Sequence, residues 1–342
     1  MGKVYRLVAT LVFLTLVGLR TEAQDPSFSQ FFASPLNINP ALTGNINGEW
    51  RLVSNLRYQW AGPAYPYVTG TISFDKKILR NKLPETSVLG VGGMLMYDKV
   101  MDGVLKSSYA SLNVNYNIQV AGDDYSSHHV GLGFGGIYGN RRMDFSRLIF
   151  GNQFNGTTFD KNLPTGESSL AQMKPYFSTS VGMLYSYNTE YANVDVGGSA
   201  FHINKPKQTF VQDENQVLPV RYVGYANYQQ LLSNILVLNA NAIYQQQSTT
   251  SYFSIGGALG YYLSDPEETD DIIVNGGLWY WSKNAIIPYV GLVYKKFQVG
   301  ITYDITISKL SAGTKRPTTF ELSLILRGDR EKQRGVIYCP WK

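Results

Sequence analysis

The segment Phe297-Gln298-Val299-Gly300-Ile301-Thr302-Tyr303-Asp304-Ile305-Thr306-Ile307 alternates between large apolar residues and small or polar ones. Successive side chains of a β-strand point to opposite faces, so the segment predicts a strand with one apolar wall and one polar wall. Residues 112–120 and 320–326 repeat the pattern. The polar positions hold mainly Asn, Ser, Thr, Gln and Gly, where a strand facing bulk water usually holds Lys, Glu and Asp. The polar wall therefore suits the interior of a barrel.

About fourteen segments of this kind are separated by turn signals along the chain. They lie near residues 51–60, 67–78, 87–98, 104–120, 127–140, 173–188, 191–202, 221–233, 235–247, 250–263, 272–282, 286–294, 297–307 and 316–326. The connections alternate in length, and the two longest are residues 141–172 and 203–220. Such alternation is typical of outer-membrane barrels, whose short turns face the periplasm. We therefore expect the long loops to be extracellular and both ends of the mature chain to lie in the periplasm.

Composition separates a membrane barrel from a soluble sheet protein. Only 16% of the residues are charged, against about 25% in ordinary soluble chains. Tyr and Trp recur near the ends of the expected strands, as in the aromatic girdles of membrane barrels: Tyr58, Trp60, Tyr67, Tyr97, Tyr185, Tyr187, Tyr261, Tyr262, Trp279 and Trp281. We predict an all-β protein, a transmembrane antiparallel up-and-down β-barrel over residues 50–326, because closure leaves no unpaired edge in lipid. The alternative, a soluble secreted sandwich or propeller, would be extracted without detergent.

Residues 1–23 have the three parts of a secretory signal peptide. Lys3 and Arg6 supply the positive start, residues 7–19 form a largely apolar run, and Ala23 supplies a small residue at the cleavage point. The apolar run is too short to cross the ~30 Å hydrocarbon layer as a helix. We expect cleavage before Gln24 and export through the inner membrane to the outer membrane.

Two further segments flank the expected barrel. Residues 24–49 contain three prolines and several Phe and Leu side chains but no regular period. We expect them to form a periplasmic or plug-like strap, packed inside the barrel or across its periplasmic mouth. Residues 327–342 form a basic tail, which we expect in the periplasm. The rest of the mature chain is nearly neutral and has no basic stripe, so nucleic acid is not an expected partner.

Metal and cofactor sites find little support in the sequence. One Cys and three His leave too few ligands for a Cys/His metal cage. His128 and His129 are adjacent, so on a strand they face opposite ways and cannot chelate one ion. Residues 265–271 form an acidic turn that could hold Ca²⁺, but a solvated turn is favoured because the loop lacks glycine and alternating ligands. The glycine-rich residues 131–136 precede a strand rather than a helix, which favours curvature or close approach within the barrel wall over a nucleotide site.

Nucleophilic catalysis is not expected either. No convincing Ser-His-Asp or Cys-His arrangement can be built from three His, of which His202 ends an expected strand. We expect Cys339 to be structural or merely tolerated. A reactive thiol is the alternative, because it needs an electropositive setting and Arg330, Lys332 and Arg334 lie nearby. We therefore expect a protein that is not an enzyme and that has no cofactor.

Several short motifs occur in order from one end of the mature chain to the other. They are an Asp-Pro-x-Phe-Ser-Gln start, an Asn-Pro-Ala-x-x-Gly segment, a Gln-Trp pair, a Tyr-Asp pair and a final Cys-Pro pair. Their residues are Asp25, Pro26, Phe28, Ser29, Gln30, Asn39, Pro40, Ala41, Gly44, Gln59, Trp60, Tyr303, Asp304, Cys339 and Pro340. With this combination the chain resembles the PorP/SprF family.

That resemblance implies an outer-membrane component of the type IX secretion system of Bacteroidota, which exports adhesins and enzymes and serves gliding motility in some species. The partners that it implies are outer-membrane lipid, periplasmic ring or lipoprotein components, and a secreted cargo or adhesin held through its C-terminal domain. The motif residues are then possible partner contacts. The alternative is a FadL-like channel or hydrophobic-solute transporter with an N-terminal plug, which a stable single-channel conductance would favour.

Overall fold

The computed structural model describes residues 25–62, 65–167, 172–209, 216–263, 272–308 and 317–328. The expected signal peptide, the acidic turn 265–271, Cys339, Pro340 and the tail beyond residue 328 lie outside the described residues. Within the described ranges, no helix is long and apolar enough to cross a membrane. The same ranges contain no group of three or more His, Cys, Asp or Glu side chains that could hold a metal ion.

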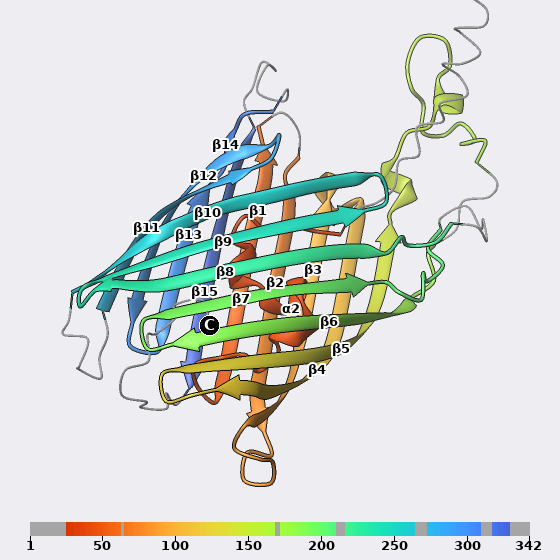
Figure 1. The fold of residues 1–342 in the computed structure, drawn as a ribbon. Helices are drawn as coiled ribbons and strands as arrows, with labels where there is room; N and C mark the ends of the chain where they lie inside the picture. The colour runs from red at the N-terminus through yellow and green to blue at the C-terminus, as the bar shows by residue number, and fades with distance from the viewer. Residues whose placement is uncertain are drawn as a thin grey trace, which may run out of the picture.

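The described strands form one closed antiparallel barrel (Figure 1). They are β1 (Trp50–Ala61), β2 (Tyr67–Ile78), β3 (Ser87–Val100), β4 (Leu105–Gly122), β5 (Ser126–Met143), β6 (Tyr176–Thr189), β7 (Ala192–Phe201), β8 (Arg221–Ser233), β9 (Leu236–Gln247), β10 (Thr250–Tyr262), β11 (Ile272–Trp281), β12 (Ala285–Tyr294), β13 (Phe297–Tyr303), β14 (Ile305–Thr306) and β15 (Thr318–Gly328). Strands adjacent in sequence pair with each other, and the pairing of β1 with β15 closes the ring. β13 and β14 are one strand interrupted at Asp304, so the described residues form a 14-strand barrel. The predicted fold class is confirmed.

The two walls of the barrel carry opposite chemistry. On β13, Phe297 and Ile301 are 50% and 55% exposed, whereas Gln298 and Thr302 are 1% and 2% exposed. The other strands alternate in the same way, with large apolar side chains outside and many buried Ser, Thr, Asn and Gln side chains inside. Apolar side chains therefore face hydrocarbon and polar side chains face the lumen, while the closed sheet satisfies the backbone. This pattern is that of a membrane β-barrel.

The two longest connections lie at one rim, although the predicted alternation of lengths is incomplete because that rim also carries the two-residue turn 248–249. The long-loop rim, at which β5 and β7 end, carries residues 144–175 and 202–220. The short-turn rim, at which β1 begins, carries the turns 190–191, 234–235 and 295–296. In Figure 1 the chain that follows β5 projects well away from the barrel. The two longest connections thus lie at the same rim.

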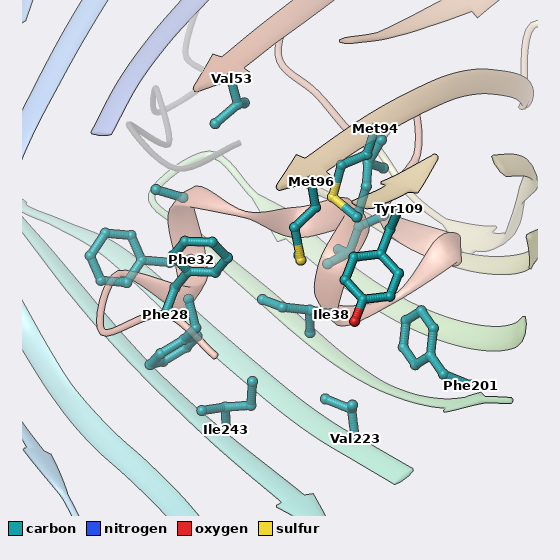
Figure 2. Close-up of a cluster of buried hydrophobic side chains, with 14 of the residues drawn as sticks. Phe28, Phe32, Ile38, Val53, Met94, Met96, Tyr109, Phe201, Val223 and Ile243 are labelled. Carbon is teal, nitrogen blue, oxygen red and sulfur yellow. The ribbon is translucent and has the colours of Figure 1, made fainter. Parts of the chain in front are cut away.

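Residues 25–49, which we call the strap, occupy the lumen. Its turns are η1 (Phe31–Ala33), α2 (Pro35–Ile38) and η2 (Pro40–Leu42). Proline opens α2 and η2, where its missing N–H is not needed, and the Asn39 side chain caps η2 by accepting a hydrogen bond from the Ala41 N–H. Apolar strap side chains pack against inward residues of the wall, including Met94, Met96, Tyr109, Phe201 and Val223 (Figure 2). The barrel therefore has an apolar core between the strap and its own wall.

Candidate functional site

The strap crosses the lumen from one rim to the other. At its start, the Asp25 N–H donates to the side chain of Gln247, the last residue of β9, at the long-loop rim. At its end, the Gly44 N–H donates to Asp75 near the short-turn rim. This differs from the prediction that the mature chain begins on the side of the short turns. The physical reason is a set of contacts across the lumen that holds the first strap residue at the opposite rim.

The Asp25 carboxylate is held by two basic side chains of the wall, His202 and Arg221. Its Oδ2 lies 2.7 Å from His202 Nε2 and 3.2 Å from Arg221 Nε. His202 directly follows β7 and Arg221 begins β8, so the antiparallel pairing of these strands places both beside the strap. Burial by itself would raise the pKa of Asp25, but the charges of His202 and Arg221 outweigh it and lower that pKa well below its usual value. Asp25 is therefore ionised at neutral pH and anchors the strap.

Substitution Asp25→Asn is expected to lower the free energy of unfolding at about pH 5 by about 2 kcal/mol, because it removes hydrogen bonds to a charged group. The folded-state pKa lies below the ordinary carboxyl value of about 3.9. The stabilisation is thus present above that value and is lost as pH falls through the lower folded-state pKa. Chemical unfolding in lipid vesicles should show a larger difference between wild type and variant at about pH 5 than at about pH 3. An equal or larger difference at the lower pH would contradict this anchor.

The same cluster contains a Ser-His-Asp relay that the sequence analysis did not foresee. Ser178 Oγ lies 2.8 Å from His202 Nδ1, on the opposite side of the ring from Asp25. A cavity of about 30 Å³ adjoins the cluster and is lined by Asp25, His202 and Arg221 but not by Ser178. Ser178 is 0% exposed, and the carboxylate is shared with Arg221. The relay is therefore suited to hold the strap, since a nucleophile needs access to its substrate.

A second buried cluster lies where β1, β13 and β15 meet. Arg57 lies 3.0 Å from Asp304 and 3.2 Å from Glu321, and these three side chains are 3% exposed or less. The strap completes the cluster, because the N–H groups of Ser29 and Gln30 donate to the two carboxylate oxygens of Glu321 at 2.8 and 3.0 Å. The Ser29 hydroxyl donates to Asp304. One cation faces two carboxylates here, so Arg57 alone cannot satisfy both. The strap donates the further hydrogen bonds that the two buried carboxylates need.

A third buried contact fixes the end of the strap. Arg51 donates to both carboxylate oxygens of Asp75, at 3.0 and 2.9 Å, and also to the Leu42 carbonyl oxygen. Asp75 accepts a further hydrogen bond from the Gly44 N–H. Gly44 has the positive φ that the sequence analysis allowed for, +70°, which any residue with a side chain rarely adopts. The turn that leads from the strap into β1 is therefore locked to the wall.

Four glycines on the inner wall make room for the strap, and we call them the glycine cradle: Gly90, Gly133, Gly182 and Gly197. A Cβ on Gly133 would lie closer than 3.0 Å to the backbone of Pro40 and Ala41. A Cβ on Gly182 or Gly197 would meet the Asn39 side chain, whose Nδ2 donates to the Met183 carbonyl oxygen at 3.0 Å. The Asn-Pro-Ala motif thus packs directly against the wall at positions where glycine leaves no side chain. For Gly133 a close approach was one of the two roles predicted for residues 131–136, but the approaching backbone is that of the strap rather than of the wall.

The remaining predicted residues take different positions. Gln59 and Trp60 form a bulge in β1, where the register with β15 shifts and Trp60 has a φ of +61°. Tyr303 is exposed on the outer wall. Pro26 lines the cavity near Asp25, and Phe28 is buried in the core.

The two adjacent histidines lie near the start of β5 and have different partners. His128 Nδ1 lies 2.7 Å from the Tyr185 hydroxyl, and His129 Nε2 lies 3.1 Å from the Ser127 hydroxyl. They do not act on a shared ligand.

The sequence analysis missed the wall residues that form hydrogen bonds and ion pairs with the strap or within its clusters. Arg51, Arg57, Asp75, Arg221 and Glu321 occupy inward positions and are buried. A usable signal existed, because each is a charged residue on the polar face of a strand whose other inward residues are mostly uncharged. Charges at such positions require partners inside the barrel.

A family model described as the type IX secretion system membrane protein PorP/SprF matches residues 20–326. The matched range includes the strap and nearly all of the barrel. A search of curated proteins returned no match.

Several solved structures are similar at low identity. The toluene transporter TbuX of Ralstonia pickettii is 10% identical over 86% of this chain and 92% of its own, with a TM-score of 0.46. The toluene transporter TodX of Pseudomonas putida is 8% identical over 89% of this chain and 94% of its own, with a TM-score of 0.44. CdiB from Escherichia coli is 9% identical over 80% of this chain and 63% of its own, with a TM-score of 0.38. Likenesses of this size carry no information about what this chain binds.

Proposed function

This chain belongs to the PorP/SprF family of type IX secretion system membrane proteins, and from that premise we propose that it is a non-enzymatic outer-membrane component of the secretion or gliding machinery. Its role is to support the secretion or surface anchoring of a partner protein, such as an adhesin. The observation that carries the proposal is the family match over residues 20–326, which takes in the strap motifs as well as the barrel. No cofactor takes part.

The strap inside the lumen supports a protein-holding role over a permanently open diffusion channel. A channel needs a continuous wet path, whereas here an apolar core and three buried charge clusters join the strap to the wall. The contacts are spread from the long-loop rim to the short-turn rim, so the strap is held along the lumen rather than at one point. We infer that the barrel works through its rims rather than through its interior.

The long-loop rim offers a surface for an exported partner. Phe154 and Phe159 pair across an isolated β-bridge, with ring centroids 5.1 Å apart, and are 48% and 56% exposed. Exposed aromatic side chains are favoured contacts in protein interfaces. The short-turn rim is the matching place for periplasmic ring or lipoprotein components if the long loops are outside.

A detergent pull-down of the tagged full-length protein from its own cells, read by mass spectrometry, tests this assignment. We expect recovery of secretion-ring components together with one large exported protein. Recovery of the barrel alone, under conditions that preserve other membrane complexes, would contradict the proposal.

A matched pair of variants sharpens the same experiment. Phe154→Ser/Phe159→Ser should reduce recovery of the exported partner severalfold and leave the ring components unchanged, because only the long-loop surface is altered. Tyr191→Ser, an exposed aromatic residue in a short-turn connection, serves as the control and should retain the exported partner. Equal loss in both variants would argue against a partner surface at the long-loop rim.

A further inference from the structure

Three cationic side chains form a row across the outer face of β3, β4 and β5. Lys99 is the direct cross-strand partner of Lys106, and Lys106 is the direct partner of Arg142. Their neighbours Ser107 and Arg141 are buried on the luminal face, so the row points outward. It lies at the long-loop rim, where β3 and β5 end. Like charges directly opposite each other destabilise a sheet unless a counter-ion is present.

A strained turn brings the lysines of this row together. Met101, Asp102 and Gly103, between β3 and β4, have φ values of +54°, +53° and +83°. Such a conformation is costly for residues with a side chain and is often found where function requires it. The Lys99 and Lys106 Cε atoms lie 2.9 and 3.2 Å from the point that a Gly103 Cβ would occupy. Because glycine leaves that point open, the ends of the two lysine stems converge there.

The charges around this turn do not balance. Asp102 lies 3.5 Å from Lys99 Nζ and 2.9 Å from Arg147 Nη2, and the hydrogen bond from Arg147 lowers the pKa of Asp102. Among the described residues, no ion-pair partner of Lys106 or Arg142 is found, and both side chains are exposed. Four cations, Lys99, Lys106, Arg142 and Arg147, thus lie near this turn with two carboxylates, those of Asp102 and of Asp144, whose N–H donates to the Val104 carbonyl oxygen. An excess of positive charge is left at this place on the rim.

The surroundings of the row are those of a lipid-facing surface. Directly toward the membrane on the same three strands lie exposed apolar and aromatic side chains: Leu95, Tyr97, Leu112, Phe134 and Tyr138. Met101 is also exposed beside the row. Cations placed just beyond an apolar wall match an amphiphile whose acyl chains lie on the wall and whose anionic headgroup lies at the rim.

We propose that Lys99, Lys106 and Arg142 form a binding site for the phosphate of a lipid headgroup in the leaflet that meets the long-loop rim. Lys106 and Arg142 bind the phosphate directly, with the Arg guanidinium able to donate two parallel hydrogen bonds. Lys99 shares its charge between that phosphate and Asp102. The site would give the barrel a fixed position among the anionic lipids of that leaflet, next to the loop that carries Phe154 and Phe159, and with the long loops outside, as expected, this is the outer leaflet.

Binding of monophosphoryl lipid A to the full-length protein, titrated in detergent and read by native mass spectrometry, tests the site. Lys106→Gln/Arg142→Gln is expected to weaken binding about thirty-fold, or roughly fivefold for each cation removed. Lys106→Gln and Arg142→Gln alone should each weaken binding only about fivefold. Lipid A without phosphate should bind the wild type as weakly as the phosphorylated lipid binds the double variant.

Lys76→Gln/Lys82→Gln provides the matched control. It removes the same charge from exposed positions at the short-turn rim, and binding should stay within a factor of about two of wild type. Binding by Lys106→Gln/Arg142→Gln that equals wild type would overturn the proposal. Equal loss in the control, or equal binding of the lipid that lacks phosphate, would overturn it as well. Heat-dependent gel mobility confirms that each variant is a folded barrel before titration.

Discussion

Replacement of Arg57 by Met is expected to lower the free energy of unfolding by about 3–5 kcal/mol and to release the start of the strap. The substitution leaves Asp304 and Glu321 buried without their cation, although both keep hydrogen bonds from the strap. Unpaired buried carboxylates must either remain charged at high cost or take up protons. Chemical unfolding in lipid vesicles measures the loss, and chymotrypsin cleavage after Phe31 or Phe32 reports the release of the strap.

A variant that removes all three charges of the cluster distinguishes the loss of charge pairing from the loss of packing. Arg57→Met/Asp304→Asn/Glu321→Gln replaces all three charges by neutral side chains, so no ion is left without a partner. It should be more stable than Arg57→Met alone, because breaking a buried pair costs more than replacing it. If the triple variant is the less stable of the two, the cluster acts through packing and the account of its charges is wrong.

Replacement of Gly133 by Ala is expected to displace the Asn-Pro-Ala motif and to destabilise the barrel by about 3 kcal/mol, at the upper end of overpacking costs. The added methyl group would meet the backbone of Pro40 and Ala41, which cannot rotate away as a side chain could. Chymotrypsin should then cleave the strap at Leu36 or Leu42, which are buried in the wild type. Unfolding in lipid vesicles gives the energetic effect.

Gly276→Ala is the matched control for this steric test. Gly276 lies on β11, and a Cβ at that position would have no heavy atom within 4 Å. The variant should keep wild-type stability and a protected strap, because alanine suits a strand at least as well as glycine. Equal cleavage of the strap in both variants would mean that the cradle does not hold it.

The barrel itself could be predicted from the sequence because its signal is local. Alternation in a segment such as 297–307 reports the two faces of one strand without knowledge of its neighbours. The composition of the polar face then distinguishes a lumen from water, as Gln298 and Thr302 show. Turn residues between the segments set the order of the strands, and neighbours in sequence pair in the structure.

The site was less predictable because its contacts join distant parts of the chain. Ser29 and Glu321 are 292 residues apart, and their contact depends on the closure of the ring between β1 and β15. Asp25 was recognised only as part of a motif, and nothing local indicates that it meets His202 at the long-loop rim. The glycines of residues 131–136 predicted a close approach, but only the folded barrel identifies Pro40 and Ala41 as what approaches.

The proposed role places partner binding at the rims of the barrel, because the strap lies in its lumen. The most direct test is the conductance of the purified full-length protein in planar lipid bilayers. We predict no stable open current from the wild type, because the buried clusters around Asp25, Arg57 and Arg51 hold the strap along the lumen. A steady, ohmic single-channel conductance from the wild-type protein would contradict the account and would favour the channel interpretation.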